Sequence, residues 1–202
     1  MIRTRDFTRN PRPEAAQGHV ALRLRDYHRA ALVEHFLELG PEDRRLRFGA
    51  TLTDEAIRAY VARIDFQRDG AFAIQDDELR LLAMVHVANS GDAAELGLSV
   101  LPAHRGYGLG QALLQRAVTH LRNRNAREVY VHCLSENVAM MHIARKSGMR
   151  IVYEGSESDA RLELPPPNAA TLFTEWLSDR QAEGVQALRR QSRLTRALLA
   201  GR

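Results

Sequence analysis

The sequence is nearly free of lysine and cysteine. Of its 29 lysine and arginine residues only Lys146 is a lysine, and Cys133 is the single cysteine. One cysteine excludes an intramolecular disulfide and a metal cluster held by cysteines. The eight histidines form no closely spaced ligand pair supported by carboxylates, so we expect no metal site.

Long hydrophobic runs are also missing. No apolar stretch approaches the roughly 20 residues of a membrane helix, and residues 1–6 lack the apolar core of a signal peptide. We therefore expect a cytoplasmic protein with no membrane partner. The formal charge of +4 at pH 7 is basic. It is too small to choose among a polyphosphorylated cofactor, an acidic partner and nucleic acid.

A glycine-rich turn joins a predicted strand to a predicted helix. The β-prone residues 95–101 enter the turn, and apolar residues at helical spacing from Leu109 to Leu121 follow it. Gly106, Gly108 and Gly110 permit positive φ and close approach to the backbone. Backbone N–H groups and the positive end of the helix dipole would then form a phosphate seat. A tight turn without a ligand is the alternative interpretation.

The spacing within this turn narrows the choice of phosphate ligand. Gly110 is not followed by the lysine of a Walker loop, and the glycines differ from Rossmann spacing. The pattern Arg105-x-x-Gly108-x-Gly110, after Val100 and Pro102, resembles motif A of the GNAT acetyltransferase superfamily. The resemblance implies that the loop holds the pyrophosphate of coenzyme A and that acetyl-CoA is the cofactor.

The order of the predicted elements favours a mixed α/β fold. We expect strands at 18–26, 71–74, 79–88, 93–101, 128–134, 149–153 and 160–164, and helices at 31–39, 53–64, 109–122 and 137–147. Residues 41–48 are predicted to be a charged connector. Such an order predicts a sheet with helices on both faces. It matches the GNAT fold, in which a mostly antiparallel sheet has splayed central strands.

Three prolines at 165–167 mark a boundary. We divide the chain into an N-terminal arm (1–17), a GNAT acetyltransferase domain (18–164) and a C-terminal helical extension (165–202). Gly184 is expected to interrupt the helix of the extension. The simplest interpretation is a terminal helix packed on the domain. A homodimer contact, a lid over the site and a nucleic-acid-binding tail are the alternatives.

Glu95 is the candidate catalytic base. Acetyl transfer from a thioester requires deprotonation of the amine, stabilisation of the carbonyl oxygen and accommodation of the thiolate. Glu95 lies on the strand that enters the phosphate loop. In the superfamily this strand splays from its neighbour and admits the pantetheine arm, where burial would favour the uncharged carboxyl. An ordinary carboxylate at a strand edge is the alternative.

Residues 94–100 also resemble the corresponding strand of bacterial protein lysine acetyltransferases, the group that modifies acyl-CoA synthetases. Their catalytic glutamate occupies the position of Glu95, and residues 44–66 and 137–149 resemble the same group. The resemblance implies an N-acetyltransferase with an amine acceptor, and a protein lysine is the favoured one. Transfer to a small amine and a catalytically silent acyl-CoA-binding module are the alternatives.

The resemblance further implies roles for the residues of the cofactor site. The pyrophosphate would be held by the loop residues Arg105, Gly106, Tyr107, Gly108, Leu109 and Gly110. The pantetheine arm would pair with Leu98, Ser99 and Val100, and Asn137 would hold the pantetheine side or the splayed strands. Many GNAT enzymes carry a general-acid tyrosine seven residues after the asparagine, but Ala144 stands there. The acid is unassigned, with water, Ser135 and His142 as candidates.

Overall fold

The computed structural model describes residues 20–200, so the predicted arm at 1–17 lies outside the described residues. The strands are β1 (Leu22–Arg23), β2 (Gly70–Gln75), β3 (Leu81–Asn89), β4 (Ala93–Val100), β5 (Glu128–Leu134), β6 (Arg150–Glu154) and β7 (Glu157–Glu163). The helices are α1 (Arg29–Leu37), α2 (Pro41–Phe48), α3 (Asp54–Arg63), α4 (Leu109–Arg122), α5 (Val138–Lys146) and α6 (Ala169–Ala200), with 3₁₀ turns at Asp26–His28 and Pro102–His104.

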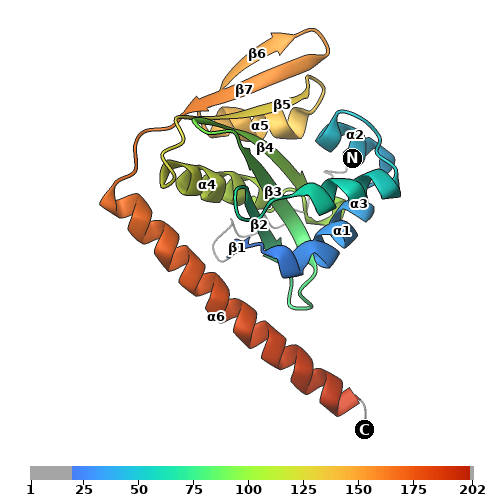
Figure 1. The fold of residues 1–202 in the computed structure, drawn as a ribbon. Coiled ribbons are helices and arrows are strands. Elements are labelled where there is room, and N and C mark those ends of the chain that lie inside the picture. The colour runs from blue at the N-terminus through green and yellow to red at the C-terminus, as the bar shows by residue number, and fades with distance from the viewer. Residues whose placement is uncertain (1–19, 201–202) are drawn as a thin grey trace, which may run out of the picture.

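The strands form one sheet in the order β1-β2-β3-β4-β5-β7-β6. Every neighbouring pair is antiparallel except β4 and β5, which run parallel. The predicted mixed, mostly antiparallel sheet is therefore confirmed. Helices cover both faces, with α4 and α5 on one side of the sheet and α1, α2 and α3 on the other (Figure 1).

Each face of the sheet has its own apolar core. Against α4 and α5 the core contains Leu96, Leu113, Val131 and Met141, and against α1 and α3 it contains Phe36, Ile57 and Met84. Side chains alternate between the faces along a strand. On β4, Leu96, Leu98 and Val100 therefore face α4, whereas Glu95, Gly97 and Ser99 face the helices α1 to α3.

The two parallel strands separate soon after they meet. Pairing between β4 and β5 covers only Ala93↔Glu128, Ala94↔Val129 and Glu95↔Tyr130, although both strands continue. On its other side, β4 stays paired with β3 as far as Val100. The structure therefore has the predicted splay, and the β5 side of β4 has no sheet partner after Glu95.

Residues 41–48 form helix α2 rather than the charged connector we predicted. Pro41 occupies the first turn, Glu42 and Asp43 place negative charge at the N-terminal end, and Gly49 ends the helix with φ of 77°. Each of these features is typical of a helix end, but the many charged residues of this segment led us to predict a connector. The prediction was wrong because the helix is short and buries none of its residues fully.

Two further predictions need correction at the edges of the fold. The strand predicted at 18–26 is only two residues long, since β1 pairs with β2 only at Leu22 and Arg23. Helix α6 runs unbroken through Gly184, because a single glycine weakens a helix by only about 1 kcal/mol. None of the helices among residues 20–200 meets the length and hydropathy needed to cross a membrane.

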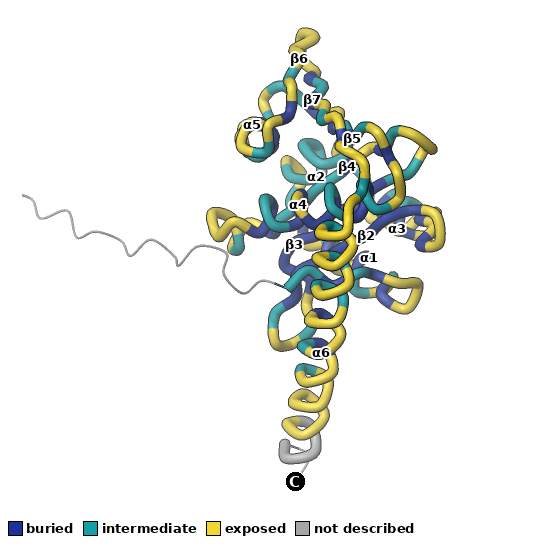
Figure 2. The backbone as a smooth tube through the Cα atoms, turned by 90° about the vertical axis from the view of Figure 1, so that its left-hand side faces the viewer, coloured by how far each residue is buried: buried dark blue, intermediate teal, exposed yellow. Residues whose placement is uncertain are grey.

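Helix α6 packs on the domain and then extends beyond it, so that much of its surface is exposed (Figures 1 and 2). Its most extensive contacts are with α4 and β1. Arg116 of α4 bonds to Glu175 at 3.1 Å and to Asp179 at 2.5 Å. Further along, Arg189 bonds to Asp77 in the β2–β3 turn. This packing agrees with the simplest interpretation of the extension.

Candidate active site

A cleft of about 620 Å³ opens where β4 leaves β5. Its floor is formed by Leu98, Ser99 and Val100, and its walls come from α2 and from α5. The glycine-rich loop closes one end. Of the predicted cofactor-binding residues, the cleft is lined by Leu98, Ser99, Val100, Arg105, Gly106, Gly108, Leu109, Gly110 and Asn137.

The glycine-rich loop has the backbone that its sequence predicts. Gly106 and Gly108 have φ of 84° and 78°, which side-chain-bearing residues rarely adopt. Gly108 precedes the first turn of α4, and no side chain caps that turn. The first N–H groups of a helix have no partner within it and carry the positive dipole end. An anion at this end of the cleft would lie close to these free N–H groups and to the positive end of the helix dipole.

Gly110 has a different role in the same turn. A Cβ on Gly110 would lie 2.7 Å from Ile143 Cδ1 and 3.3 Å from Leu98 Cδ2. Both distances are shorter than ordinary van der Waals contact. The glycine therefore allows α4 to pack closely against β4 and α5, and it shapes the cleft through packing rather than through φ.

Arg105 and Asn137 fix the two walls of the cleft. Arg105 Nε donates to the Val100 carbonyl oxygen at 3.1 Å, and its Nη2 pairs with Asp43 of α2 at 2.7 Å. Asn137 caps α5 by accepting from Met140 N at 3.0 Å, and its Nδ2 donates to the Leu46 carbonyl oxygen at 3.2 Å. Asn137 thus ties α5 to α2 across the cleft.

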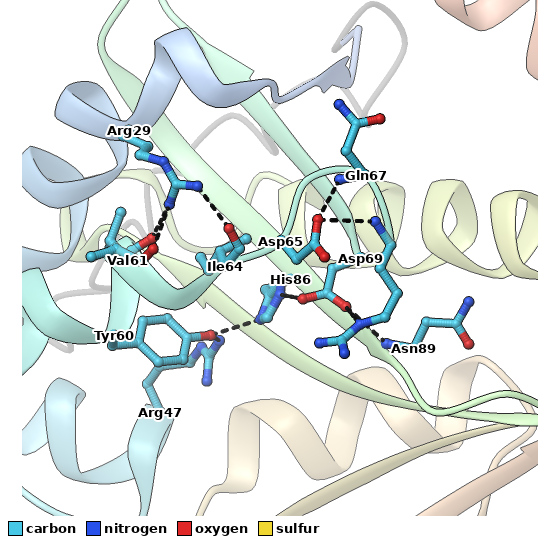
Figure 3. Close-up of polar contacts among 12 residues, drawn as sticks. Arg29, Arg47, Tyr60, Val61, Ile64, Asp65, Gln67, Asp69, His86 and Asn89 are labelled. Atoms are coloured by element: carbon cyan, nitrogen blue, oxygen red, sulfur yellow. Dashed lines mark hydrogen bonds and ion pairs between the residues drawn. The ribbon is translucent and has the colours of Figure 1, made fainter.

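A chain of polar groups that we did not predict extends from Arg47, which lines the cleft, to Asp69 (Figure 3). Arg47 Nη2 donates to the Tyr60 hydroxyl at 3.1 Å, and that hydroxyl lies 2.8 Å from His86 Nδ1. His86 Nε2 is 3.3 Å from Asp69 Oδ2. Arg68 Nε binds the other oxygen of Asp69 at 3.1 Å.

The charges along this chain follow from burial and from its own bonds. Burial lowers the pKa of His86, and the nearby charge of Arg47 lowers it further. Burial alone would raise the pKa of Asp69, but bonds from Arg68, the Asn89 amide and His86 hold it below its usual value. His86 is therefore a neutral imidazole and Asp69 a carboxylate, and these two states determine which atoms carry the protons. Tyr60 donates to Nδ1, and the Nε2 proton points at Asp69.

The family model described as "Acetyltransferase (GNAT) domain" matches residues 21–150. The chain belongs to the GNAT acetyltransferase family. It is an N-acetyltransferase, and its acetyl donor is acetyl-CoA. No curated protein sequence matches the chain.

Solved GNAT structures share this fold. The GNAT domain of S. lividans PAT is 21% identical, with a TM-score of 0.62 over 71% of this chain and 89% of that one. YncA from Salmonella typhimurium, solved with its cofactor acetyl-CoA, is 17% identical (TM-score 0.56, 75% and 96% covered). Spermidine N-acetyltransferase from Vibrio cholerae, in complex with CoA and spermine, is 18% identical (0.57, 71% and 94%).

The cleft of this GNAT enzyme fits an elongated ligand with phosphates at one end. The glycine loop and the first turn of α4 offer backbone donors there, and Lys146 lines the cleft on the α5 side. The β5 side of β4 from Leu96 to Val100 offers backbone groups to an extended arm. Anion-binding and strand-pairing groups are thus arranged along one channel.

Two predicted site residues lie outside the lining of the cleft. Tyr107 belongs to the glycine-rich loop, but it is 46% exposed and does not line the cleft. Glu95 is also exposed rather than buried, so the predicted burial of its carboxyl is wrong. Its side chain lies on the same sheet face as Gly97, and Glu95 is the last residue of β4 that pairs with β5. This is the face opposite α4.

Of the candidate general acids Ser135 and His142, only His142 lines the cleft. Ser135 Oγ is engaged with Ser158 Oγ at 2.7 Å and with the carbonyl oxygen of Glu157 at 2.8 Å, away from the cleft. Ala144 is completely buried in the core and presents no functional group. Cys133 is buried as expected, and burial raises the pKa of its thiol to about 11.

Proposed function

We propose that the enzyme transfers acetyl from acetyl-CoA to an amine, with a protein lysine as the favoured acceptor and Glu95 as the base. The observation that carries the proposal is the channel along β4, which joins the glycine loop to the face holding Glu95. The donor supplies an acetyl thioester. The other steps belong to residues of the chain.

The cofactor-binding residues act through backbone groups and packing. The amides from Gly106 to Gly110 hold the diphosphate, and Arg105 adds its charge while it remains paired with Asp43. Leu98 to Val100 pair with the pantetheine arm, and one of their N–H groups polarises the thioester carbonyl. Asn137 keeps α5 and α2 at a fixed separation. Together these contacts orient the donor before the acceptor arrives.

The acceptor side carries negative charge suited to a cationic amine. Glu95 lies near His132, whose pKa is raised by its hydrogen bond to Asp159 and by the charges of Glu157 and Glu95. These carboxylates attract a lysine side chain or another ammonium group. Glu95 then takes the ammonium proton, directly or through water, because only the neutral amine can attack.

A small amine is the second candidate acceptor. The structural neighbour that is a spermidine N-acetyltransferase, solved with spermine, favours it. The neighbour from a PAT protein, which matches the resemblance to protein lysine acetyltransferases, favours the first. A parallel screen of lysine-bearing proteins and small polyamines decides between them, because a preferred acceptor shows as a large difference in thiol release.

Replacement of Glu95 tests the proposed base. In Glu95→Gln we expect turnover to fall about 100-fold or more, because general-base catalysis is lost, while acetyl-CoA affinity stays within about twofold. Thiol release measures the first quantity and titration calorimetry the second.

The matched control for this test is Glu154→Gln, which removes an exposed carboxylate from β6. It should retain the turnover of the wild type. Unchanged turnover in Glu95→Gln would remove this residue from its role. Absence of acetyl-CoA binding by the wild type at high micromolar concentration would overturn the proposal as a whole.

A further inference from the structure

The guanidinium of Arg47 lies at the inner end of the cleft, against β4. Arg47 lines the cleft together with Leu98 and Ser99. A Cβ on Gly97 would overlap the guanidinium, so only glycine lets it rest against the strand at this position. Gly97 is also two residues beyond Glu95, the last residue that pairs with β5.

Several contacts hold the guanidinium in this place. Its Cζ lies 4.7 Å from the ring centre of Phe48, 5.7 Å from that of Phe36 and 5.8 Å from that of Tyr60. Nη2 also donates to the Tyr60 hydroxyl, which is fixed in turn by His86. Rings on one side and a hydrogen-bonded hydroxyl on another fix the position of the charge.

Part of the binding capacity of this group is unused. Arg47 Nε is buried and has no hydrogen-bond partner among the described residues. Arg47 takes part in none of the ion pairs between residues 20 and 200, in which the α2 cations are Arg44 and Arg45. No carboxylate among these residues therefore neutralises it directly. Arg47 is half-buried, and partial desolvation of a cation without an anion is unfavourable. The arrangement therefore favours an anion at the inner end of the cleft.

The layout of the channel indicates which anion this is. The glycine loop, which is suited to the diphosphate, closes the opposite end, and Val100, Ser99 and Leu98 lie in sequence between the loop and Arg47. A donor held by its diphosphate and paired along β4 would bring its sulfur end toward Arg47. In acetyl transfer, the sulfur gains negative charge there when its bond to carbon breaks.

We propose that Arg47 pairs with the thiolate of coenzyme A as it leaves. The inference rests on the proposed function. The acceptor nitrogen forms a bond to the carbonyl carbon, the carbon–sulfur bond breaks, and its electron pair stays on sulfur beside the guanidinium. Because Glu95 already holds the first ammonium proton, the nitrogen gives its remaining extra proton to water, and the thiolate later takes up a proton from the solvent.

This role explains how the enzyme functions without an acid at position 144. Many GNAT enzymes carry a general-acid tyrosine at this position, but Ala144 is buried and has no proton to give. A fixed cation lowers the energy of a thiolate without donating a proton. Tyr60, His86 and Asp69 act as positioning residues, because they hold the guanidinium rather than contact the sulfur.

The thiol of bound coenzyme A provides a test that does not need an acceptor. Thiolate absorbance in the ultraviolet is titrated for the complex of full-length protein with coenzyme A, and the same complex with coenzyme A lacking its thiol serves as the blank. We expect the pKa of the bound thiol to be at least about one unit below that of free coenzyme A, because an opposite charge lies beside it.

Other charged or titratable groups around the cleft are Asp43 and Arg105 at the loop end, His104 beside them, and His142 and Lys146 on α5. Tyr60, His86 and Glu95 lie near the inner end. The shift is therefore compared between variants that keep all of these groups. The shift should vanish in Arg47→Gln and persist in part in Arg47→Lys.

Gly97→Ala provides a variant that retains the arginine and displaces it, and it should also lose most of the shift. Arg58→Gln, which removes an exposed arginine from α3, should keep the full shift. A bound thiol that titrates as in free coenzyme A, or a shift of equal size in Arg47→Gln, overturns the inference. Calorimetry separates the two proposals, because loss of binding by the wild type refutes both of them. Binding without a shift refutes only the role of Arg47.

Discussion

His35 connects two strands through its two ring nitrogens. Nδ1 lies 2.8 Å from the Leu81 carbonyl oxygen and Nε2 lies 2.8 Å from Ser99 Oγ. The carbonyl can only accept, so Nδ1 carries the proton and Nε2 accepts from the hydroxyl. Ser99 lines the cleft. A buried side chain of α1 thus fixes the position of Ser99, which lies at the bottom of the cleft.

Acid should destabilise the fold through His35. Burial lowers its pKa to about 4, against 6.5 for the unfolded chain. The unfolded state therefore binds the proton first as the pH falls below 6.5, and stability decreases until the pH passes the folded value. At pH 5 the loss from this residue is about 2 kcal/mol. Urea unfolding at pH 7.5 and pH 5 measures it.

A variant with no titratable group at this position, His35→Gln, should lose that part of the pH dependence, whatever its stability at pH 7.5. The matched control is His132→Gln. His132 has a raised pKa because of its bond to Asp159, so its contribution is present at low pH and is lost as the pH rises. An identical acid loss in His35→Gln and in the wild type would contradict the assignment.

The glycine-rich loop could be predicted because its residues are adjacent in the sequence. The position of Arg47 could not, because it depends on residues far from it in the chain. The loop's residues, from Arg105 to Gly110, are adjacent in the chain, and their backbone conformation follows from glycine itself. Arg47 reaches the site from α2 only because Gly97, fifty positions away, has no side chain. No pattern of neighbouring residues in the sequence predicts that Arg47 lies against Gly97. Its partners His86 and Asp69 are equally dispersed.

At the scale of elements, glycine affects α2 and α6 in opposite ways. Gly49 ends α2 with a φ of 77°, whereas Gly184 lies inside α6 with no atom within 4 Å of where a Cβ would be. Gly184→Ala should therefore stabilise the protein by about 0.5–1 kcal/mol, because alanine loses less backbone entropy in a helix. The midpoint of urea denaturation reports the change.

The same substitution at Gly49 is the matched comparison. Alanine is strained at positive φ, so Gly49→Ala should destabilise the protein. Equal effects at the two positions would contradict the continuity of α6. The two glycines also illustrate the limit of sequence reasoning. Gly184 was expected to interrupt its helix, and no helix was expected before Gly49. Only the conformation that each glycine adopts separates a helix end from a tolerated glycine.

At the scale of the whole molecule, α6 is joined to the domain through Glu175. This carboxylate accepts from Arg116 at 3.1 Å, from His120 at 2.6 Å and from Asn123 at 2.6 Å. Burial alone would raise its pKa, but the bonds from His120 and Asn123 and the charge of Arg116 lower it to about 2. Arg116 is itself buried and lies over the ring of Phe72.

Removal of the Glu175 charge should therefore loosen the attachment of α6. Glu175→Gln leaves Arg116 buried with only Asp179 as its counter-charge, and we expect a loss of about 3 kcal/mol in the free energy of unfolding. Glu183→Gln, on the same helix, breaks an exposed pair with Arg180 and should change it by less than about 0.5 kcal/mol. Comparable losses in both variants would refute a structural role for α6.

The sequence predicted the order of most elements correctly, because alternation and helical spacing are written along the chain. It did not predict how α6 attaches, since Glu175 and Arg116 come from segments about sixty residues apart. Nor did it show that Glu95 would stay exposed. Burial is a property of the neighbours that the fold assembles around a residue.

The early parting of β4 from β5 also bears on how accessible this strand edge is to other molecules. An unpaired strand edge invites any extended segment to add to the sheet, including one from another molecule. Here α2 and α5, tied together by Asn137, stand on either side of that edge. A second polypeptide that added to this edge would have to fit between the two helices, so they hinder strand addition from another molecule while the cleft stays open to an extended ligand.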